Sequence, residues 1–384
     1  MLFTKRFSFF LCVLSALCGS LSAQDYKTVA DGVEYAEMTR TIAGQPVRMN
    51  LLRLDLTKTR LDVVHAMDAA IGTEAVSSIA KRHGALAAIN AGFFRLDSSI
   101  FAGDPAGLFI IDGEIISEPS KNRIVLGIRN RAAMTEVAIG RSELSRAVVI
   151  GKRDVEISGS NRERGDNELI LYAPTFHRTT LTSGAGIEII VQRNRVTRII
   201  REKGSSSIPS GGYVLSASGI KAAEAAKLFK IGQSVELVQR VRSIRISHQP
   251  DAPQIETFED AVAGVPQLIN DGQIDITWQE EKTTKSFVET RHPRTAVAKL
   301  KDGKFLMITV DGRSESSGGI GLPDLAALLL ELGATDAMNL DGGGSTTMYL
   351  DGKVVNHPSD KEGERKVSDA IIVTPRRPRQ RHDR

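Results

Sequence analysis

Short apolar runs, bounded by glycine, proline, asparagine or aspartate, recur along most of the chain. Such runs, rich in β-branched residues and separated by turn residues, are typical of β-strands. They predict strands over residues 47–56, 61–65, 108–111, 124–128, 168–173, 186–192, 213–217, 235–241, 295–299 and 305–310. The Asp-Gly pairs that begin at Asp112, Asp302 and Asp351 lie between two such runs, which predicts tight hairpin turns.

Helical periodicity is confined to a few segments. The pattern predicts helices over residues 74–82, 221–229 and 322–332, and the last is the strongest. Pro323 and Asp324 stand in its first turn and Gly333 follows its end, as helix start and stop signals require. Few helices among many strands predict an α+β fold with a large mixed β-sheet.

Residues 305–341 combine a strand, a loop, a helix and a second strand, which predicts a βαβ crossover between parallel strands. Parallel strands end at the same edge of a sheet, and ligands bind outside that edge. Asp311 and Asp341 follow the two strands directly. Arg294 opens a hairpin strand that turns at Asp302, so it is brought to the same edge as Asp311. We therefore expect a site where these three side chains meet.

Asn90 is a further polar residue at the end of an apolar run, and only Ala91 and Gly92 separate it from the aromatic residues Phe93 and Phe94. Asn90 is therefore also expected at the sheet edge where Asp311 and Asp341 lie. An ordinary turn residue would show the same local sequence pattern.

The stretch NLDGGGSTTM, residues 339–348, contains three consecutive glycines, so three successive backbone positions carry no side chain. Successive backbone N–H groups of Gly342, Gly343 and Gly344 can form a concave anion-binding nest, and Ser345 and Thr346 would add hydroxyl donors. Asp341 would repel a dianion there unless Arg294 or a metal offset its charge. A loose surface loop is the alternative interpretation. His357 follows soon after and is expected to reach the site, whereas the lysine of a nucleotide-binding P-loop is missing.

The chain begins with the layout of a secretory signal peptide. Lys5 and Arg6 precede an apolar run, and Ala23 ends a short series of small residues. Both cysteines, Cys12 and Cys18, lie within this segment, so the remainder has no thiol and no disulfide. These features predict a bacterial protein that is secreted or periplasmic and has no stable membrane span after cleavage. An uncleaved membrane anchor is the alternative.

The formal net charge of +4 comes from the two ends of the chain. The segment 376–384 is arginine-rich and has no apolar residue, which predicts a disordered basic tail. The body between the ends is nearly neutral. A nucleic-acid partner is therefore not expected, because such proteins carry a clustered positive charge.

The motifs NAGFF, PAGLFIIDG, RTAVA, TVDGRSESSGG, NLDGGGSTTM, HPSD and KVSDAIIV follow one another in the order found in the phosphodiester glycosidase family, which the chain resembles. The resemblance runs from about Gly84 to Val373 and implies a glycosidase domain over 84–374. Together with the ends of the chain, this predicts a signal peptide over 1–23, strands and a helix packed on the catalytic domain over 24–83, and a tail over 375–384. It implies hydrolysis of a sugar-1-phosphodiester at the sugar C1–O bond.

In this interpretation Asp311, Asp341 and Arg294 are catalytic. The aspartates would stabilise positive charge on the sugar ring, with one of them as base or nucleophile, and Arg294 would hold the departing phosphate together with the glycine nest. The substrate would also contact the residues Asn90, Gly92, Phe94, Asn339, Gly342, Gly343, Gly344, Ser345, Thr346 and His357.

Two other classes of function remain open at this stage. The protein could be a non-catalytic binder of envelope polysaccharide. It could also be a phosphodiesterase in which Asp311 and Asp341 hold Ca²⁺ or Mg²⁺, since hard cations prefer carboxylate oxygens, and water attacks phosphorus. No cofactor is otherwise indicated.

Overall fold

The computed structural model describes residues 25–244 and 258–376. The signal-peptide prediction for residues 1–23 lies outside the described residues, as does most of the predicted tail. Pro375 and Arg376, predicted to be disordered, are ordered instead. Pro375 ends a strand, and the Arg376 guanidinium donates to the Thr135 hydroxyl at 2.9 Å and to the Arg131 carbonyl at 2.6 Å.

The described strands form four sheets. The largest has eight strands, in the order β1 (Lys27–Ala30), β2 (Val33–Ile42), β3 (Gln45–Leu54), β21 (Phe305–Val310), β20 (Arg294–Leu300), β22 (Ala334–Asn339), β18 (Gln267–Asn270) and β19 (Gln273–Ile274). A five-stranded sheet has the order β24 (Lys353–Val354), β23 (Met348–Leu350), β5 (Ala87–Asn90), β25 (Asp369–Pro375) and β4 (Thr59–His65). The N-terminal strands therefore belong to the same sheets as the C-terminal ones.

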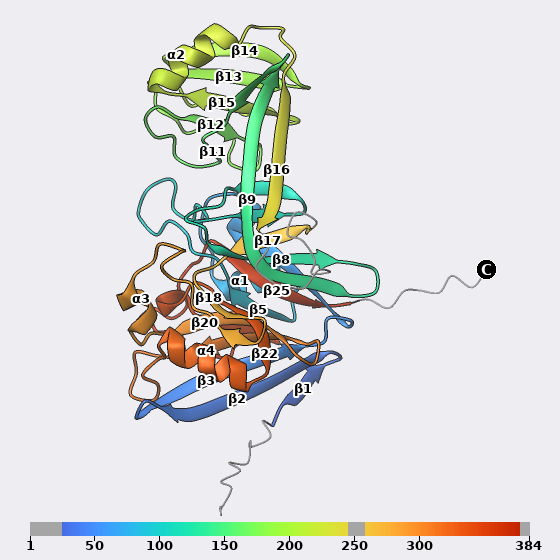
Figure 1. Ribbon diagram of the computed structural model, residues 1–384, viewed down its shortest axis with the longest axis vertical. Coiled ribbons are helices and arrows are strands. Elements are labelled where there is room, and N and C mark those ends of the chain that lie inside the picture. Colours follow the sequence, from blue (N-terminus) through green and yellow to red (C-terminus); the bar gives the residue numbers. More distant parts are fainter. Residues whose placement is uncertain (1–24, 245–257, 377–384) are drawn as a thin grey trace, which may run out of the picture.

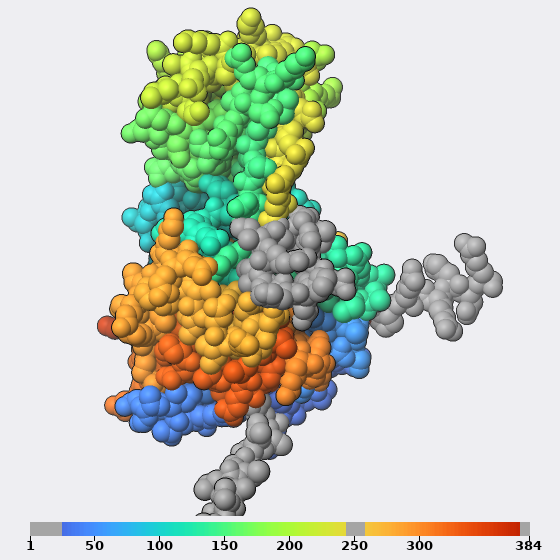
Figure 2. Space-filling view, in the orientation of Figure 1, coloured from blue at the N-terminus to red at the C-terminus, as the bar shows by residue number. Residues whose placement is uncertain are grey.

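The other two sheets connect the body to a separate lobe. A seven-stranded sheet contains β10 (Arg153–Glu156), β9 (Thr135–Ile150), β8 (Ile124–Asn130), β17 (Asp260–Ala263), β6 (Phe109–Ile111) and β7 (Glu114–Ser117), and β16 (Glu236–Ile244) pairs with β9. The lobe sheet has the order β11 (Gly159–Ser160), β12 (Leu169–Tyr172), β15 (Gly212–Ala217), β13 (Ile187–Gln192) and β14 (Arg195–Arg201). The long β9–β16 ribbon carries this lobe above the body (Figures 1 and 2).

The helices are few, as the sequence predicts: α1 (Val76–Arg82), α2 (Gly219–Leu228), α3 (Lys285–Glu289) and α4 (Leu322–Glu331). Three of them match the predicted segments. The predicted α+β class, rich in strands and with few helices, is confirmed. The strands divide among four sheets and, among the described strands, only β11 and β12 pair in parallel. No helix in the described part of the chain is long and apolar enough to cross a membrane.

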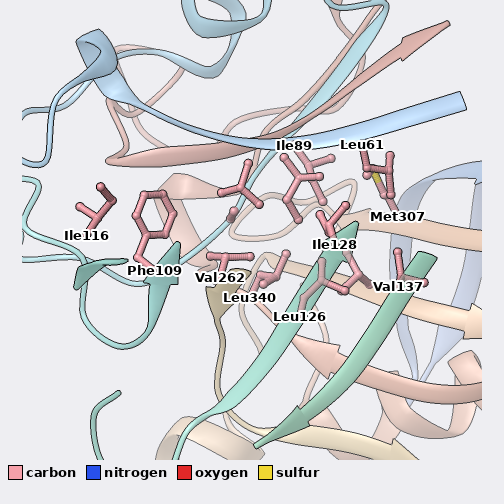
Figure 3. Close-up of a cluster of buried hydrophobic side chains, with 14 of the residues drawn as sticks. Leu61, Ile89, Phe109, Ile116, Leu126, Ile128, Val137, Val262, Met307 and Leu340 are labelled. Carbon is pink, nitrogen blue, oxygen red and sulfur yellow. The ribbon is translucent and has the colours of Figure 1, made fainter. Parts of the chain in front are cut away.

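The core explains why the central strands read as continuous apolar runs. One face of the eight-stranded sheet packs on α4, and the other contributes Val297, Met307 and Met338 to the main core cluster, so these strands are buried on both faces. Figure 3 shows Ile89 and Leu340 pointing into this cluster. Each immediately precedes a predicted site residue, Asn90 and Asp341 respectively. Burial of these two side chains therefore fixes where the chain leaves the core and enters the site.

Candidate functional site

The predicted meeting of Asp311, Asp341 and Arg294 at one sheet edge is seen in the strand register. β21 and β22 both run antiparallel to β20, so their chains leave the sheet in the same direction. Arg294 pairs with Val310, the residue before Asp311, and Leu340 connects β22 to Asp341. We call this end of the eight-stranded sheet the site edge.

A third carboxylate, that of Asp369, reaches the site edge from another sheet. The backbone N–H of Ala91 donates to the Asp369 carbonyl at 3.2 Å, and the Ala91 carbonyl accepts the N–H of Asp341 at 2.9 Å. The residue after β5 is thus hydrogen-bonded to both acidic residues. The Asp369 carboxylate also accepts the Gly92 N–H and the Ser368 hydroxyl. Asp369 belongs to the motif KVSDAIIV but was not among the predicted site residues, because it begins a strand and does not end one.

The Asp341 and Asp369 carboxyls share an unusual electrostatic environment. Desolvation raises the pKa of each from its ordinary value of 3.8 to about 6. The Asp369 charge raises the pKa of Asp341 further, whereas the Gly342 N–H, donating to Asp341 Oδ1 at 2.9 Å, and the Arg365 charge lower it. The Ser345 hydroxyl beside Asp341 also lowers this pKa, although its geometry falls short of a hydrogen bond. The Asp369 charge thus couples Asp341 to Asp369, and burial makes both carboxyls keep a proton to a higher pH than an ordinary aspartate does.

Asp311 is buried in a different setting. Its Oδ1 accepts the backbone N–H of His357 at 3.0 Å and the Asn356 amide at 3.4 Å. Its Oδ2 is buried and has no hydrogen-bond partner, and the nearest cation is Arg48 Nε at 3.9 Å. Burial raises the pKa of this carboxyl. The structure therefore brings His357 to Asp311 through its backbone, while the imidazole belongs to an exposed residue.

Asn90 and Asn356 connect the loops of the site edge. Asn90 donates to the Asp341 carbonyl at 2.7 Å, and its Oδ1 accepts the Thr295 hydroxyl at 2.8 Å and the Thr347 N–H at 3.1 Å. Asn356 donates to the Thr346 carbonyl at 3.0 Å as well as to Asp311. Asn90, expected to bind sugar hydroxyls, is fully buried and uses its side chain to position the Asp341 loop. Asn339 is similarly buried, and its amide donates to the Val265 and Leu340 carbonyls.

The glycines serve a different purpose from the predicted anion nest. Most of the backbone N–H groups are already used: Gly342 donates to Asp341, Gly343 donates to the Pro293 carbonyl, and Ser345 and Thr346 close a 3₁₀ turn. A Cβ at Gly342 would lie 2.8 Å from the Pro293 carbonyl oxygen, and Gly343 has a positive φ of 62°. A side chain at Gly344 would overlap the Asp360–Arg365 ion pair. The run is glycine because other backbone and guanidinium groups approach it too closely for a side chain.

Several buried polar atoms at the site edge have no partner among the described residues. They are the hydroxyls of Ser345, Thr346 and Thr347, Asn339 Oδ1, His292 Nδ1 and Asp311 Oδ2. Buried polar groups are normally hydrogen-bonded, and unsatisfied ones call for a bound water, ion or ligand. Ser345 and Thr346 were both predicted to contact substrate, and their hydroxyls have no partner among the described residues that would compete for that contact.

Arg294 does not have the surroundings of a phosphate clamp. It is 2% exposed, and its guanidinium donates to the carbonyls of Phe287 at 2.6 Å, Thr290 at 2.9 Å and Ile320 at 3.3 Å. Burial lowers its pKa to about 10. These contacts tie β20 to the α3 and α4 segments, and they correct the prediction that this guanidinium is directed at the glycine loop.

We expect Arg294→Lys to lower the melting temperature and to cost about 2–4 kcal/mol of unfolding free energy, because an ammonium group cannot satisfy three divergent carbonyls. Thermal denaturation of the folded variant measures this. Arg291→Lys is a matched control with a single carbonyl bond, from Nη2 to Gly319, and should cost much less. A stable Arg294→Lys that loses turnover only on phosphodiesters would instead restore the clamp role.

Other cations take the place that Arg294 was expected to fill. Arg313 Nη2 would lie 3.0 Å from a Cβ at Gly343, and the Arg313 guanidinium donates only to the Ser359 hydroxyl, at 3.3 Å, among the described residues. Arg365 lies over Gly344 and acts on the pKa of Asp341. Burial lowers the pKa of His292, and the Arg294 and Arg313 charges lower it further. Arg313 lies two residues after Asp311 in the motif TVDGRSESSGG, and this spacing could have identified it as a site residue from the sequence.

The aromatic residue at the site is Phe93 and not the predicted Phe94. Phe94 packs on the core cluster beneath α1. Phe93 contacts Phe287 edge to face with ring centroids 6.1 Å apart, Arg123 lies over the Phe93 ring at 5.3 Å, and Arg294 over the Phe287 ring at 4.9 Å. Burial lowers the pKa of Arg123, and the charges of Glu281 and Asp341 partly oppose this, which places Arg123 near Asp341.

Gly92 was expected to contact substrate, and its surroundings explain why it lacks a side chain. A Cβ there would meet Val262 Cγ2 at 3.1 Å and the Asp369 carboxylate at 3.2 Å. For the metal interpretation, the described residues contain no group of three or more His, Cys, Asp or Glu side chains placed to hold an ion.

Part of the chain is similar in sequence to a known protein family. Residues 185–374 match the family described as phosphodiester glycosidase. Over these residues the chain is similar to a phosphodiester glycosidase domain. The matched residues include Arg294, Asp311, Asp341 and Asp369, so the whole site edge except the β5 segment falls within the domain.

Individual relatives are similar to the chain over shorter stretches. A 112-residue segment is 37% identical to N-acetylglucosamine-1-phosphodiester alpha-N-acetylglucosaminidase of Bos taurus, covering 27% of this chain and 21% of that protein. A 94-residue segment is 40% identical to an uncharacterized SPbeta prophage-derived protein of Bacillus subtilis (strain 168), covering 24% and 14%. The chain thus spans less than a quarter of either relative.

A solved structure supports the fold over nearly the whole chain. A hypothetical protein from Synechocystis superposes with a TM-score of 0.77 at 23% identity, covering 92% of this chain and 64% of that one. At this identity the likeness concerns the fold alone.

Proposed function

We propose that the protein is an exported hydrolase that cleaves the sugar C1–O bond of a sugar-1-phosphodiester in an envelope or extracellular glycan. The observation that carries the proposal is the coupled pair Asp341 and Asp369, hydrogen-bonded on either side of Ala91, with the pKa of each raised to about 6. Two buried carboxyls of this kind place negative charge where the sugar ring becomes positive, and one of them can act as base or nucleophile in hydrolysing a glycosidic bond.

The bond changes follow from the charges at the site edge. Water attacks C1, the bond from C1 to the phosphate oxygen breaks, and the oxygen leaves with the electron pair as a phosphomonoester. The ionised carboxylate of the pair either takes the proton from the water or first attacks C1 itself. Asp311, with its unpartnered Oδ2, provides a further negative charge to stabilise positive charge on the sugar ring.

The phosphate is held in this proposal by groups on the other side of the glycine loop. Arg313 has no acidic partner among the described residues, so its guanidinium is free to bind two phosphate oxygens. The hydroxyls of Ser345 and Thr346 add neutral donors. A phosphomonoester is a good leaving group, since its second pKa is about 6, and strong protonation of the departing oxygen is not required.

Hydrolysis in ¹⁸O-labelled water tests the proposal against its rival. Cleavage at C1–O places the label in the released sugar, whereas attack of water on phosphorus places it in the phosphate. A glucose-1-phosphodiester of an alkyl alcohol is a suitable probe. Label in the phosphate would overturn the proposal and favour the metal-dependent phosphodiesterase, and binding without turnover would favour the polysaccharide-binding protein.

The pH dependence of turnover reports the coupled pair. We expect the acid limb of kcat/KM to have an apparent pKa near 6, about two pH units above that of an ordinary aspartate, because the first carboxylate must be ionised. The Arg365 charge lowers the pKa of Asp341, so Arg365→Met should move this limb to higher pH.

The control for that shift is Arg40→Met, which removes a guanidinium paired with Glu331 on the surface and should leave the limb in place. A limb near pH 4 in the unmodified protein would contradict the assignment of the raised pKa values to the reacting groups.

A further inference from the structure

A cavity of about 800 Å³ lies between the β9–β16 ribbon, β10 and the first residues of the lobe. Its lining includes Glu118 after β7, Ser142 and Arg146 on β9, Ser158 and Gly159 at the start of the lobe, and Arg242 on β16. None of the residues of the site edge lines it. Its volume is that of a pocket for a small molecule the size of a sugar.

Arg146 is the unusual residue of this cavity. It is 6% exposed, and its Nε, Nη1 and Nη2 are all buried without a hydrogen-bond partner. The Ser142 hydroxyl, on the same strand, is also buried and unpartnered. A buried guanidinium without a partner costs several kcal/mol, and natural proteins normally compensate such a charge with an anion.

Among the described residues, no acidic group makes a hydrogen bond or ion pair with Arg146. Glu118, the acidic group that acts on Arg146, is occupied: its carboxylate accepts Arg162 Nε at 2.7 Å and the Ser160 N–H at 3.0 Å. The other carboxylates of the lining, those of Glu143, Asp154 and Glu156, belong to exposed residues. They repel a doubly charged ligand more strongly than a singly charged one.

We propose that this cavity binds a small, singly charged oxyanion, such as the carboxylate of a sugar acid or a phosphodiester, through the Arg146 guanidinium and the Ser142 hydroxyl. A planar guanidinium presents two parallel donors that match two oxygens of either group. The site is separate from the glycosidase chemistry and does not depend on it, because the two share no residue.

The test is binding of D-glucuronate and of diethyl phosphate to the full chain, measured by calorimetry and thermal shift, with glucose as the neutral control. We expect at least one of the two oxyanions to bind and to raise the melting temperature, and glucose to do neither. Arg146→Met should weaken that binding about thirtyfold or more, because the charged partner is lost. Which of the two binds identifies the oxyanion as carboxylate or phosphodiester.

Two further measurements separate binding from a structural role. Arg146→Met without ligand should melt no lower than the unmodified protein, since the substitution removes an unpaired buried charge. Arg242→Met, which removes an exposed charge from the same cavity, should weaken binding only about threefold or less. The proposal is overturned if neither oxyanion binds, if both Met variants bind as tightly as the unmodified protein, or if Arg146→Met is destabilised in the absence of ligand.

Discussion

Replacing Asp341 or Asp369 by asparagine is expected to lower kcat/KM for a sugar-1-phosphodiester by about 10²–10³ while leaving a folded protein. Asparagine keeps an oxygen that can accept the Gly342 or Gly92 N–H, so the local hydrogen bonds largely survive. What is lost is the exchangeable proton and the negative charge. Because the two carboxyls act as one unit, the double variant should be little worse than either single one.

Stability provides an independent readout for the same variants. The pKa of Asp369 is raised from 3.8 to about 6 in the folded protein, so the folded state holds the proton more tightly than the unfolded chain. This acid therefore costs stability as the pH rises from about 4, and the cost is complete above about 6. The asparagine side chain of the variant Asp369→Asn cannot ionise, so the free energy of unfolding at pH 7 should rise by about 1–3 kcal/mol. The variant should therefore melt at a higher temperature.

Asp260 offers a matched control for this experiment. Its carboxyl is also buried, its pKa is also raised to about 6 by desolvation, and it also accepts backbone N–H groups, from Val63 and Asp112. It lines a cavity of about 590 Å³ beside β4, to which no residue of the site edge contributes. Asp260→Asn should therefore keep kcat/KM. Equal losses in Asp260→Asn and Asp369→Asn would mean that burial of charge, and not the reaction, explains both.

Asp311→Asn is expected to lower kcat/KM by about 10² or more, again without unfolding the protein. The Asn oxygen can still accept the His357 N–H and the Asn356 amide, so the Asp311 loop stays tied to the glycine loop. The unpartnered Oδ2 and its charge disappear, and with them the attraction for positive charge on the sugar ring. The loss should appear in kcat more than in KM, since this charge forms only in the transition state.

Glu37→Gln is the control for Asp311, because Glu37 also pairs with Arg48, at 2.8 Å. Its removal should change kcat/KM no more than about threefold, as is usual for an exposed ion pair. If Glu37→Gln is as damaging as Asp311→Asn, then Asp311 acts through the position of Arg48. A folded Asp311→Asn with near-normal rates would remove Asp311 from the catalytic machinery.

The sequence by itself determined the strands and helices that local pattern controls. The α4 helix, the β20–β21 hairpin and the convergence of Arg294, Asp311 and Asp341 were all predictable, because burial on both sheet faces imposes continuous apolar runs and the turn residues stand between them. The long strand β9 was not predicted. The mostly polar stretch 140–146 interrupts its apolar residues, so this strand lacks a continuous apolar run.

Tertiary structure decided what each polar residue at the site edge does. The sequence placed Arg294 correctly but could not show that three carbonyls from distant segments would occupy its guanidinium. It indicated that the glycines admit close neighbours, and only the fold revealed that these are Pro293, Arg313 and Arg365. Asp369 joins the site because β25 pairs with β5, a contact between residues far apart in the chain. Side-chain partners and pKa values depend on such long-range packing, which local sequence does not encode.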